Sequence, residues 1–124
     1  MSKRILVIED IEDNRQIIRD LLTSFDYELI EATDGAEGVA LAQSQHPDLI
    51  LMDIQLPVMD GYEATRQIRA ITELAQIPII AVTSYALSGD ETKSGEAGCD
   101  GYIAKPFSPR QLLAKIREFL PDGS

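Results

Sequence analysis

Short apolar runs alternate with amphipathic segments along the whole chain. Unbroken apolar runs between loop residues are typical of strands buried on both faces of a parallel sheet. A buried helix can show the same run, but these runs are too short for a typical helix, and Pro57 soon follows the third. The second run mixes apolar and acidic residues, as an edge strand does. The pattern therefore predicts five strands, at residues 4–8, 27–32, 49–53, 77–83 and 101–104.

Capping signals stand between these strands. An Asp or Ser followed three positions later by Glu or Gln can satisfy the free N–H groups of a first helical turn. Such pairs predict four helix starts, at Asp13 with Gln16, Asp34 with Glu37, Asp60 with Glu63, and Ser88 with Glu91. A last helix is predicted after Ser108, because Pro109 suits a first-turn position.

Apolar residues at helical spacing predict which side of a helix faces the core. In the first helix they are Ile17, Ile18, Leu21, Leu22 and Phe25, and in the last Leu112, Leu113, Ile116, Phe119 and Leu120. The helix after Ser88 has few apolar residues and is expected to stop at Gly98. We expect it to be the least firmly packed element and the one most able to move.

Strands and helices thus alternate five times along the chain. This alternation predicts an α/β fold, in which right-handed crossovers place helices on both faces of one doubly wound parallel sheet. The length of 124 residues suits one compact domain, 1–124, with its core at 4–120. We see no internal repeat and no linker.

Charge and cysteine content limit the kinds of partner and the cellular setting that fit this chain. Acidic residues outnumber basic ones by 21 to 11, and the net charge of −10 repels phosphate backbones, so nucleic-acid binding is not expected. No apolar stretch has the length of a membrane span, so no membrane association is expected either. A single cysteine cannot form an internal disulfide, and no signal-peptide pattern follows Met1. These features favour a reducing, cytoplasmic setting.

Reactive side chains stand at the ends of four predicted strands: Glu9 with Asp10, Asp53, Thr83 and Lys105. The carboxyl ends of parallel strands lie along one edge of the sheet, where ligands bind. Three carboxylates in one pocket need a positive partner, and these few oxygens suit Mg²⁺ better than Ca²⁺, which takes more protein ligands. A metal, an ammonium group and a hydroxyl around Asp53 suit a phosphoryl group attached to that carboxylate. The alternative is a salt-bridged structural cluster.

With these residues the sequence resembles the receiver domain of two-component response regulators, the CheY-like superfamily. The likeness spans residues 4–120. The residues that match the family's motifs are Glu9 and Asp10, Asp53 with the following segment 56–61, Thr83, and residues 105–107. The resemblance implies a flavodoxin-like fold with sheet order 2-1-3-4-5. Segments 85–90 and 98–102 are most similar to two subgroups, the DivK-like stand-alone regulators and the receivers attached to hybrid histidine kinases.

The resemblance implies a role for each site residue. Asp53 accepts a phosphoryl group from a phosphohistidine on a histidine kinase or a histidine phosphotransfer protein. Asp10 and Asp53 bind Mg²⁺, the backbone carbonyl of Gln55 supplies a further ligand, and Glu9 acts through a water molecule. Lys105 pairs with the phosphoryl group.

The resemblance also implies a conformational switch. Thr83 moves toward the phosphoryl group and Tyr102 turns inward, so that the face made by the fourth helix, the fifth strand and the last helix changes for a downstream protein target. The bond between Lys105 and Pro106 is cis in this family, an isomer that costs little only before proline. We therefore expect not an enzyme but a phosphoacceptor switch that assists its own phosphorylation and dephosphorylation, as a monomer or weak dimer.

Other functions fit the sequence less well. A phosphatase with an Asp nucleophile is disfavoured, because Gln55 stands two residues after Asp53 where a second acid is needed, and no cap domain is available. A nucleotide or flavin binder needs a Gly-rich phosphate loop where segment 9–13 is acidic. A receiver excised from a hybrid kinase or a longer regulator stays open as an alternative, although Met1 and the short tail favour a stand-alone regulator.

Two further residues could carry chemistry. His46 is the only histidine, and its polar flanks predict a surface loop rather than a phosphoryl carrier. Cys99 is expected to be a small, partly buried filler before the last strand rather than a redox sensor.

Overall fold

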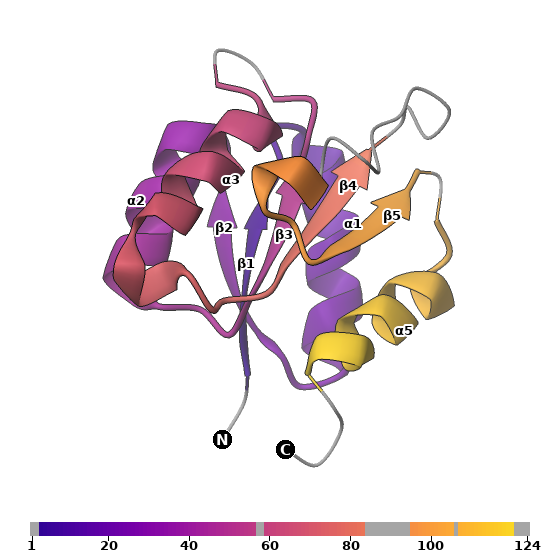
Figure 1. The fold of residues 1–124 in the computed structure, drawn as a ribbon. Coiled ribbons are helices and arrows are strands. Elements are labelled where there is room, and N and C mark those ends of the chain that lie inside the picture. Colours follow the sequence, from indigo (N-terminus) through magenta and orange to yellow (C-terminus); the bar gives the residue numbers. More distant parts are fainter. Residues whose placement is uncertain (1–2, 57–58, 84–94, 106, 121–124) are drawn as a thin grey trace.

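The predicted strands form one parallel sheet in the computed structural model, which describes residues 3–56, 59–83, 95–105 and 107–120 (Figure 1). The strands are β1 (Arg4–Ile8), β2 (Glu28–Ala32), β3 (Leu49–Asp53), β4 (Ile79–Thr83) and β5 (Gly101–Ala104). Their order across the sheet is β2-β1-β3-β4-β5, and every neighbouring pair is parallel. The α/β class and the order 2-1-3-4-5 are therefore confirmed, and β2 lies at one edge as predicted.

Helices cover both faces of this sheet (Figure 1). One face carries α2 (Gly35–Gln45), α3 (Gly61–Ala70) and the short 3₁₀ helix η1 (Thr72–Leu74), and the other carries α1 (Glu12–Ser24) and α5 (Pro109–Phe119). Within the described ranges, none of the helices combines the length and the apolar character that a membrane span needs.

The two apolar cores share the strands of the sheet. Successive side chains of a strand point to opposite faces, so a strand covered on both sides must be apolar throughout. In β1, Leu6 and Ile8 pack into the core beneath α2 and α3, whereas Ile5 and Val7 pack into the core beneath α1 and α5. All five residues of β3 are buried, including Asp53 at its end. The unbroken apolar runs were thus a correct sign of central strands.

Side-chain caps start most of the described helices. Asp34 accepts a hydrogen bond from the Glu37 N–H at 2.8 Å, and Asp60 accepts one from the Glu63 N–H at 2.9 Å. Ser108 and Gln111 form a reciprocal capping box, with Pro109 in the first turn. These three predicted caps are confirmed, whereas the predicted pair of Ser88 and Glu91 lies outside the described residues.

The prediction that Asp13 caps the first helix is wrong. Helix α1 begins at Glu12, and Ile11 occupies the capping position without a side-chain cap. Glu12 and Asp13 lie in the first turn, where a negative charge is also favourable because of the helix dipole. An acidic run at a helix start therefore does not tell the cap from the first turn.

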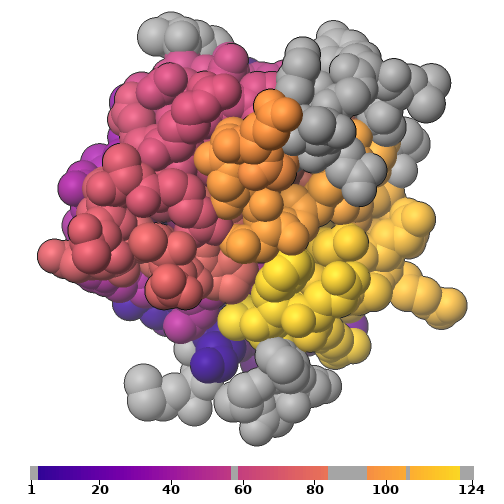
Figure 2. Space-filling view, in the orientation of Figure 1, coloured from indigo at the N-terminus to yellow at the C-terminus, as the bar shows by residue number. Residues whose placement is uncertain are grey.

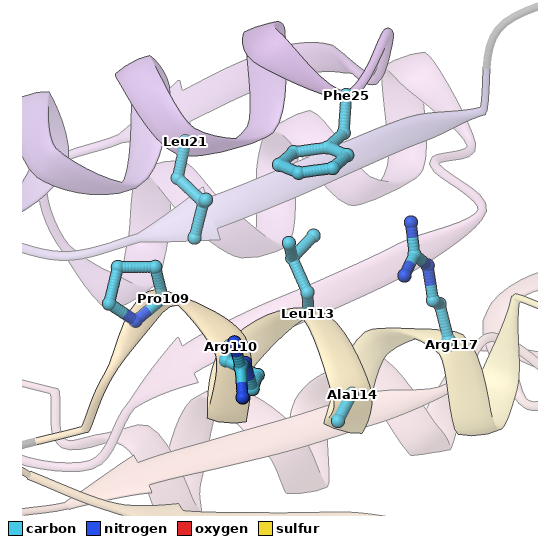
Figure 3. A pocket seen from close by; sticks show the side chains of 7 residues that line it. All are labelled: Leu21, Phe25, Pro109, Arg110, Leu113, Ala114 and Arg117. Atoms are coloured by element: carbon cyan, nitrogen blue, oxygen red, sulfur yellow. The ribbon is translucent and has the colours of Figure 1, made fainter.

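The apolar stripe of α1 is narrower than predicted. Ile18 and Leu22 are buried in the core, but Ile17 is 62% exposed and Phe25 is 46% exposed. Helix α5 lies beside this part of α1 and leaves a groove between the two helices (Figure 3). Phe25 lines this groove, and the guanidinium carbon of Arg117 lies 5.6 Å from the centre of its ring. The spacing of apolar residues marks a helix face but not how far a neighbouring helix covers it.

The fourth strand begins two residues later than predicted. The Ile77 N–H donates to the carbonyl of Leu74, which places Ile77 in a turn. Pro78 has no N–H group to donate to a neighbouring strand, and its carbonyl accepts from Ile50 at 2.9 Å. The ladder of β4 therefore starts at Ile79.

The side chain of Arg69 joins α3 to the segments on either side of β4. It donates to the main-chain carbonyls of Gly98, Leu74, Ala75 and Ile77, and it forms a salt bridge with Asp100. Asp100 also accepts a hydrogen bond from the Ile79 N–H at 3.0 Å, which ties the start of β5 to the start of β4. Gly98 has a φ of +112°, and a Cβ there would lie 2.7 Å from Cγ of Arg69.

We expect Arg69→Gln to lower the free energy of unfolding by about 2 kcal/mol, since several charge-assisted hydrogen bonds are lost together. The matched control is Arg66→Gln on the same helix, where an exposed side chain forms an ion pair with Glu63 at 3.7 Å and a change below about 0.5 kcal/mol is expected. Urea unfolding followed by circular dichroism measures both. Equal effects of the two substitutions would contradict a structural role of Arg69.

Candidate functional site

The reactive strand ends lie on four neighbouring strands. Because β1, β3, β4 and β5 are consecutive in the sheet, the residues at their carboxyl ends form one row. Glu9 follows β1, Asp53 ends β3, Thr83 ends β4 and Lys105 follows β5. The prediction that these residues share one edge is confirmed, and β2, which brings no such residue, lies outside the row.

Lys105 lies between two buried carboxylates. Its ammonium nitrogen is 3.1 Å from Oε1 of Glu9 and 3.6 Å from Oδ2 of Asp53. The side chains of Glu9 and Asp53 are only 3% and 5% exposed, respectively. Buried carboxylates repel each other unless a positive group lies between them, and here the ammonium group takes that place.

A third carboxylate completes an acidic cluster. Glu9, Asp10 and Asp53 each offer one oxygen, and these oxygens lie within 4.8 Å of one another. Although much of Asp10 is exposed, the surrounding chain removes part of its carboxyl group's contact with water and so raises its pKa. A side-chain hydrogen bond with Glu9 and the negative charge of Glu9 raise this pKa further. Closely spaced carboxylate oxygens of this kind suit a hard divalent cation such as Mg²⁺.

Groups on the start of α1 hold Glu9 in place. Its Oε2 accepts a hydrogen bond from the Ile11 N–H at 3.1 Å, and its Oε1 accepts one from Nδ2 of Asn14 at 3.3 Å. Its main-chain carbonyl accepts from Nη1 of Arg15 at 2.8 Å. The sequence analysis missed Asn14 and Arg15. The one sequence feature that could have pointed to these two residues is their place in the first two turns of the helix that follows the acidic pair.

The loop after β3 orients Asp53. Its Oδ1 accepts a hydrogen bond from the Gln55 N–H at 2.9 Å, and the Ile54 N–H continues the ladder by donating to Val82. The start of α3 packs directly against this loop, because a Cβ on Gly61 would lie only 2.4 Å from the carbonyl oxygen of Asp53. Only glycine permits this close approach.

The predicted switch residues lie on β4 and β5. Thr83 is fully buried, and its carbonyl accepts from the Lys105 N–H at 2.7 Å. Tyr102 is half-buried, stands opposite Ala81 in the sheet and packs against the core beneath α2 and α3. The predicted cis bond before Pro106 lies outside the described residues.

The residues set aside by the sequence analysis do not belong to the cluster. His46 is exposed just after α2, as predicted, and its Nε2 is 4.0 Å from Glu73. Cys99 packs between the sheet and α3 beside Thr65, and burial raises the pKa of its thiol, which fits a filler role.

Comparison with known proteins identifies the family. Residues 5–117 match the family model of the response regulator receiver domain. The chain belongs to this family. It is 43% identical over 123 residues to the polar-differentiation response regulator DivK of Brucella ovis, an alignment that covers 99% of this chain and 100% of that protein. The resemblance found in the sequence is thus confirmed.

Solved structures of other receivers have the same fold. The receiver domain of the sensor histidine kinase PA1611 from Pseudomonas aeruginosa is 40% identical, with a TM-score of 0.91 and coverage of 97% of this chain and 98% of that one. That structure has a magnesium ion coordinated in its active-site cleft. The chemotaxis protein CheY4 of Vibrio cholerae is 28% identical, with a TM-score of 0.91 and coverage of 96% and 99%. Receivers are signalling switches, so membership places this chain in two-component signalling.

Proposed function

We propose that the protein is a response regulator of a phosphorelay that accepts a phosphoryl group on Asp53. The observation that carries this proposal is the position of Lys105, whose ammonium nitrogen lies 3.6 Å from Asp53 beside a cluster of three carboxylates. The donor is a phosphohistidine on a histidine kinase or a histidine phosphotransfer protein. The single cysteine, which cannot form an internal disulfide, supports a cytoplasmic setting.

The chain's own residues provide most of what the transfer needs. A carboxylate oxygen of Asp53 attacks phosphorus, the bond from phosphorus to the histidine nitrogen breaks, and that nitrogen keeps the electron pair. The Gln55 N–H holds the Asp53 carboxylate in a fixed orientation, which reduces the entropy lost on reaction. Lys105 neutralises charge on the phosphoryl oxygens, and phosphoryl transfer depends chiefly on such positioning and charge stabilisation.

Mg²⁺ fits the acidic cluster in charge and in ligand type. Asp10, Asp53 and the backbone carbonyl of Gln55 would hold the ion, with Glu9 acting through a water molecule. The ion supplies positive charge that offsets the carboxylates and the incoming phosphoryl oxygens. The magnesium ion in the active-site cleft of the PA1611 receiver supports this assignment.

The proposal predicts a labile, Mg²⁺-dependent adduct on Asp53. After incubation with Mg²⁺ and acetyl phosphate, a small phosphoryl donor, intact-mass spectrometry should show one added phosphoryl group on the wild type and none on Asp53→Asn. The matched control is Asp48→Asn, because Asp48 directly precedes β3, at the amino end of that strand, and accepts a hydrogen bond there from the Arg4 N–H. Asp48→Asn should gain the adduct to the same extent as the wild type, and EDTA should abolish the adduct in these two proteins. A full adduct on Asp53→Asn would refute the assignment.

We further propose that phosphorylation draws Thr83 and Lys105 toward the phosphoryl group and that Tyr102 follows. Only one arrangement of these side chains satisfies the new acceptor oxygens, so the modification shifts the population toward it. Thr83 is fully buried at the end of β4, and its carbonyl accepts from the Lys105 N–H, which places it beside the second residue of the switch and supports its role as the sensor. The shape of the surface around β5 and α5 then changes for a downstream protein target.

Replacing Thr83 by Ala should uncouple this response from phosphorylation. Amide resonances in β5 and α5 should shift when the wild type is phosphorylated, and in Thr83→Ala these shifts should fall to roughly half or less while the adduct still forms. The control is Thr65→Ala, another fully buried threonine, whose hydroxyl donates to Gly61 at 2.7 Å. Shifts of wild-type size in Thr83→Ala would show that Thr83 does not relay the signal.

A further inference from the structure

Arg15 connects the metal-binding edge to the acidic surface of α1 and β2. Its Nη1 donates to the main-chain carbonyl of Glu9 at 2.8 Å, its Nε lies 3.3 Å from Oε1 of Glu31, and its Nη2 pairs with Glu12. The side chain is only 11% exposed, so this guanidinium group is held firmly by its three acceptors. The planar guanidinium group of arginine has several donors in fixed directions, so it suits a position with three acceptors better than the ammonium group of lysine does.

Arg19, one turn further along α1, provides a natural comparison. It pairs with the same two acids, at 2.7 Å from Oε1 of Glu31 and 3.2 Å from Oε1 of Glu12. These pairs raise the pKa of the Arg19 guanidinium and lower the pKa of Glu31. Among the hydrogen bonds of the described residues, however, the Glu9 carbonyl accepts from Arg15 and not from Arg19. The contact with Glu9 therefore distinguishes the two arginines.

The backbone of Glu9 is fixed on both sides. Its N–H donates to the carbonyl of Ala32 at 3.1 Å, which extends the ladder between β1 and β2, and its own carbonyl accepts from Arg15. That carbonyl belongs to the peptide unit that leads to Asp10. Asp10 is exposed, so the direction of its carboxylate toward Asp53 depends on how this peptide unit is held.

We propose that Arg15 is a positioning residue for the divalent-cation site. It orients the peptide unit between Glu9 and Asp10 so that the oxygens of both side chains converge with that of Asp53. The inference rests on the cation-binding part of the proposed function and is independent of phosphoryl transfer. Groups that orient the ligands of a metal affect its affinity although they do not touch it.

Charge and geometry predict opposite results for the loss of Arg15. Removing a positive charge near three carboxylates makes the pocket more negative, which by itself strengthens the binding of a divalent cation. Releasing the peptide unit between Glu9 and Asp10 lets the carboxylates diverge, which weakens binding. The direction of the change therefore shows which effect dominates.

The test measures Mn²⁺ affinity by electron paramagnetic resonance in the wild type, Arg15→Gln and Arg19→Gln. We expect Arg15→Gln to weaken Mn²⁺ binding about tenfold, at the lower end of the range for groups that orient a metal ligand. Arg19→Gln removes the same charge from a residue that pairs with the same two acids. This variant should bind Mn²⁺ at least as tightly as the wild type. Should Arg15→Gln fail to fold, Arg15→Lys carries the comparison, with a smaller loss expected because one ammonium group cannot serve all three acceptors.

The remaining outcomes overturn the inference. Affinity in Arg15→Gln equal to or tighter than that of the wild type would show that Arg15 acts through charge alone. An equal loss in both variants would assign the effect to Glu12 and Glu31 rather than to the Glu9 carbonyl. A wild type that binds no Mn²⁺ would contradict the cation site itself, and this result is separate from any difference between the arginines.

Discussion

The ammonium group of Lys105 lies 3.1 Å from Glu9 and 3.6 Å from Asp53, and the edge of the sheet depends on this arrangement. Both carboxylates are nearly inaccessible to water, so each needs a positive partner or hydrogen-bond donors inside the protein. Glu9 has donors of its own from the start of α1, whereas Asp53 has the Gln55 N–H and the shared ammonium group. Of these two buried carboxylates, Asp53 is thus the one that gains more from an added cation, and it is also the proposed phosphoryl acceptor.

The sheet order makes this arrangement possible. Each of the four strands that carry site residues neighbours the next, so side chains from distant parts of the sequence converge at one edge. Lys105 and Glu9 are 96 positions apart in the sequence and still form a direct contact. The same strands form both apolar cores, which gives the site a rigid base. Thr83 ends β4 and Lys105 follows β5, so the proposed phosphorylation would bear directly on these two strands.

Much of this could be predicted from the sequence because short, unbroken apolar runs between loop residues favour buried parallel strands. The apolar run before Asp53 identified a central strand, and its end identified the ligand-binding edge. The sheet order came from family resemblance, because apolar periodicity says nothing about which strands are neighbours. Arg15 was missed because a polar residue on a helix has no pattern that reveals its partner. Ile17 was misplaced because helical spacing does not show which residues another helix will cover.

The claim that Lys105 offsets the buried carboxylates can be tested by a double-mutant cycle. The free energy of unfolding is measured by urea denaturation for the wild type, Lys105→Met, Glu9→Gln and the double variant, followed by circular dichroism because the chain has no tryptophan. The account predicts that Lys105→Met alone costs about 3 kcal/mol, since it leaves buried carboxylates unpaired, and that Glu9→Gln relieves this cost with a coupling energy of about 2 kcal/mol. Additive effects within about 0.3 kcal/mol would contradict it.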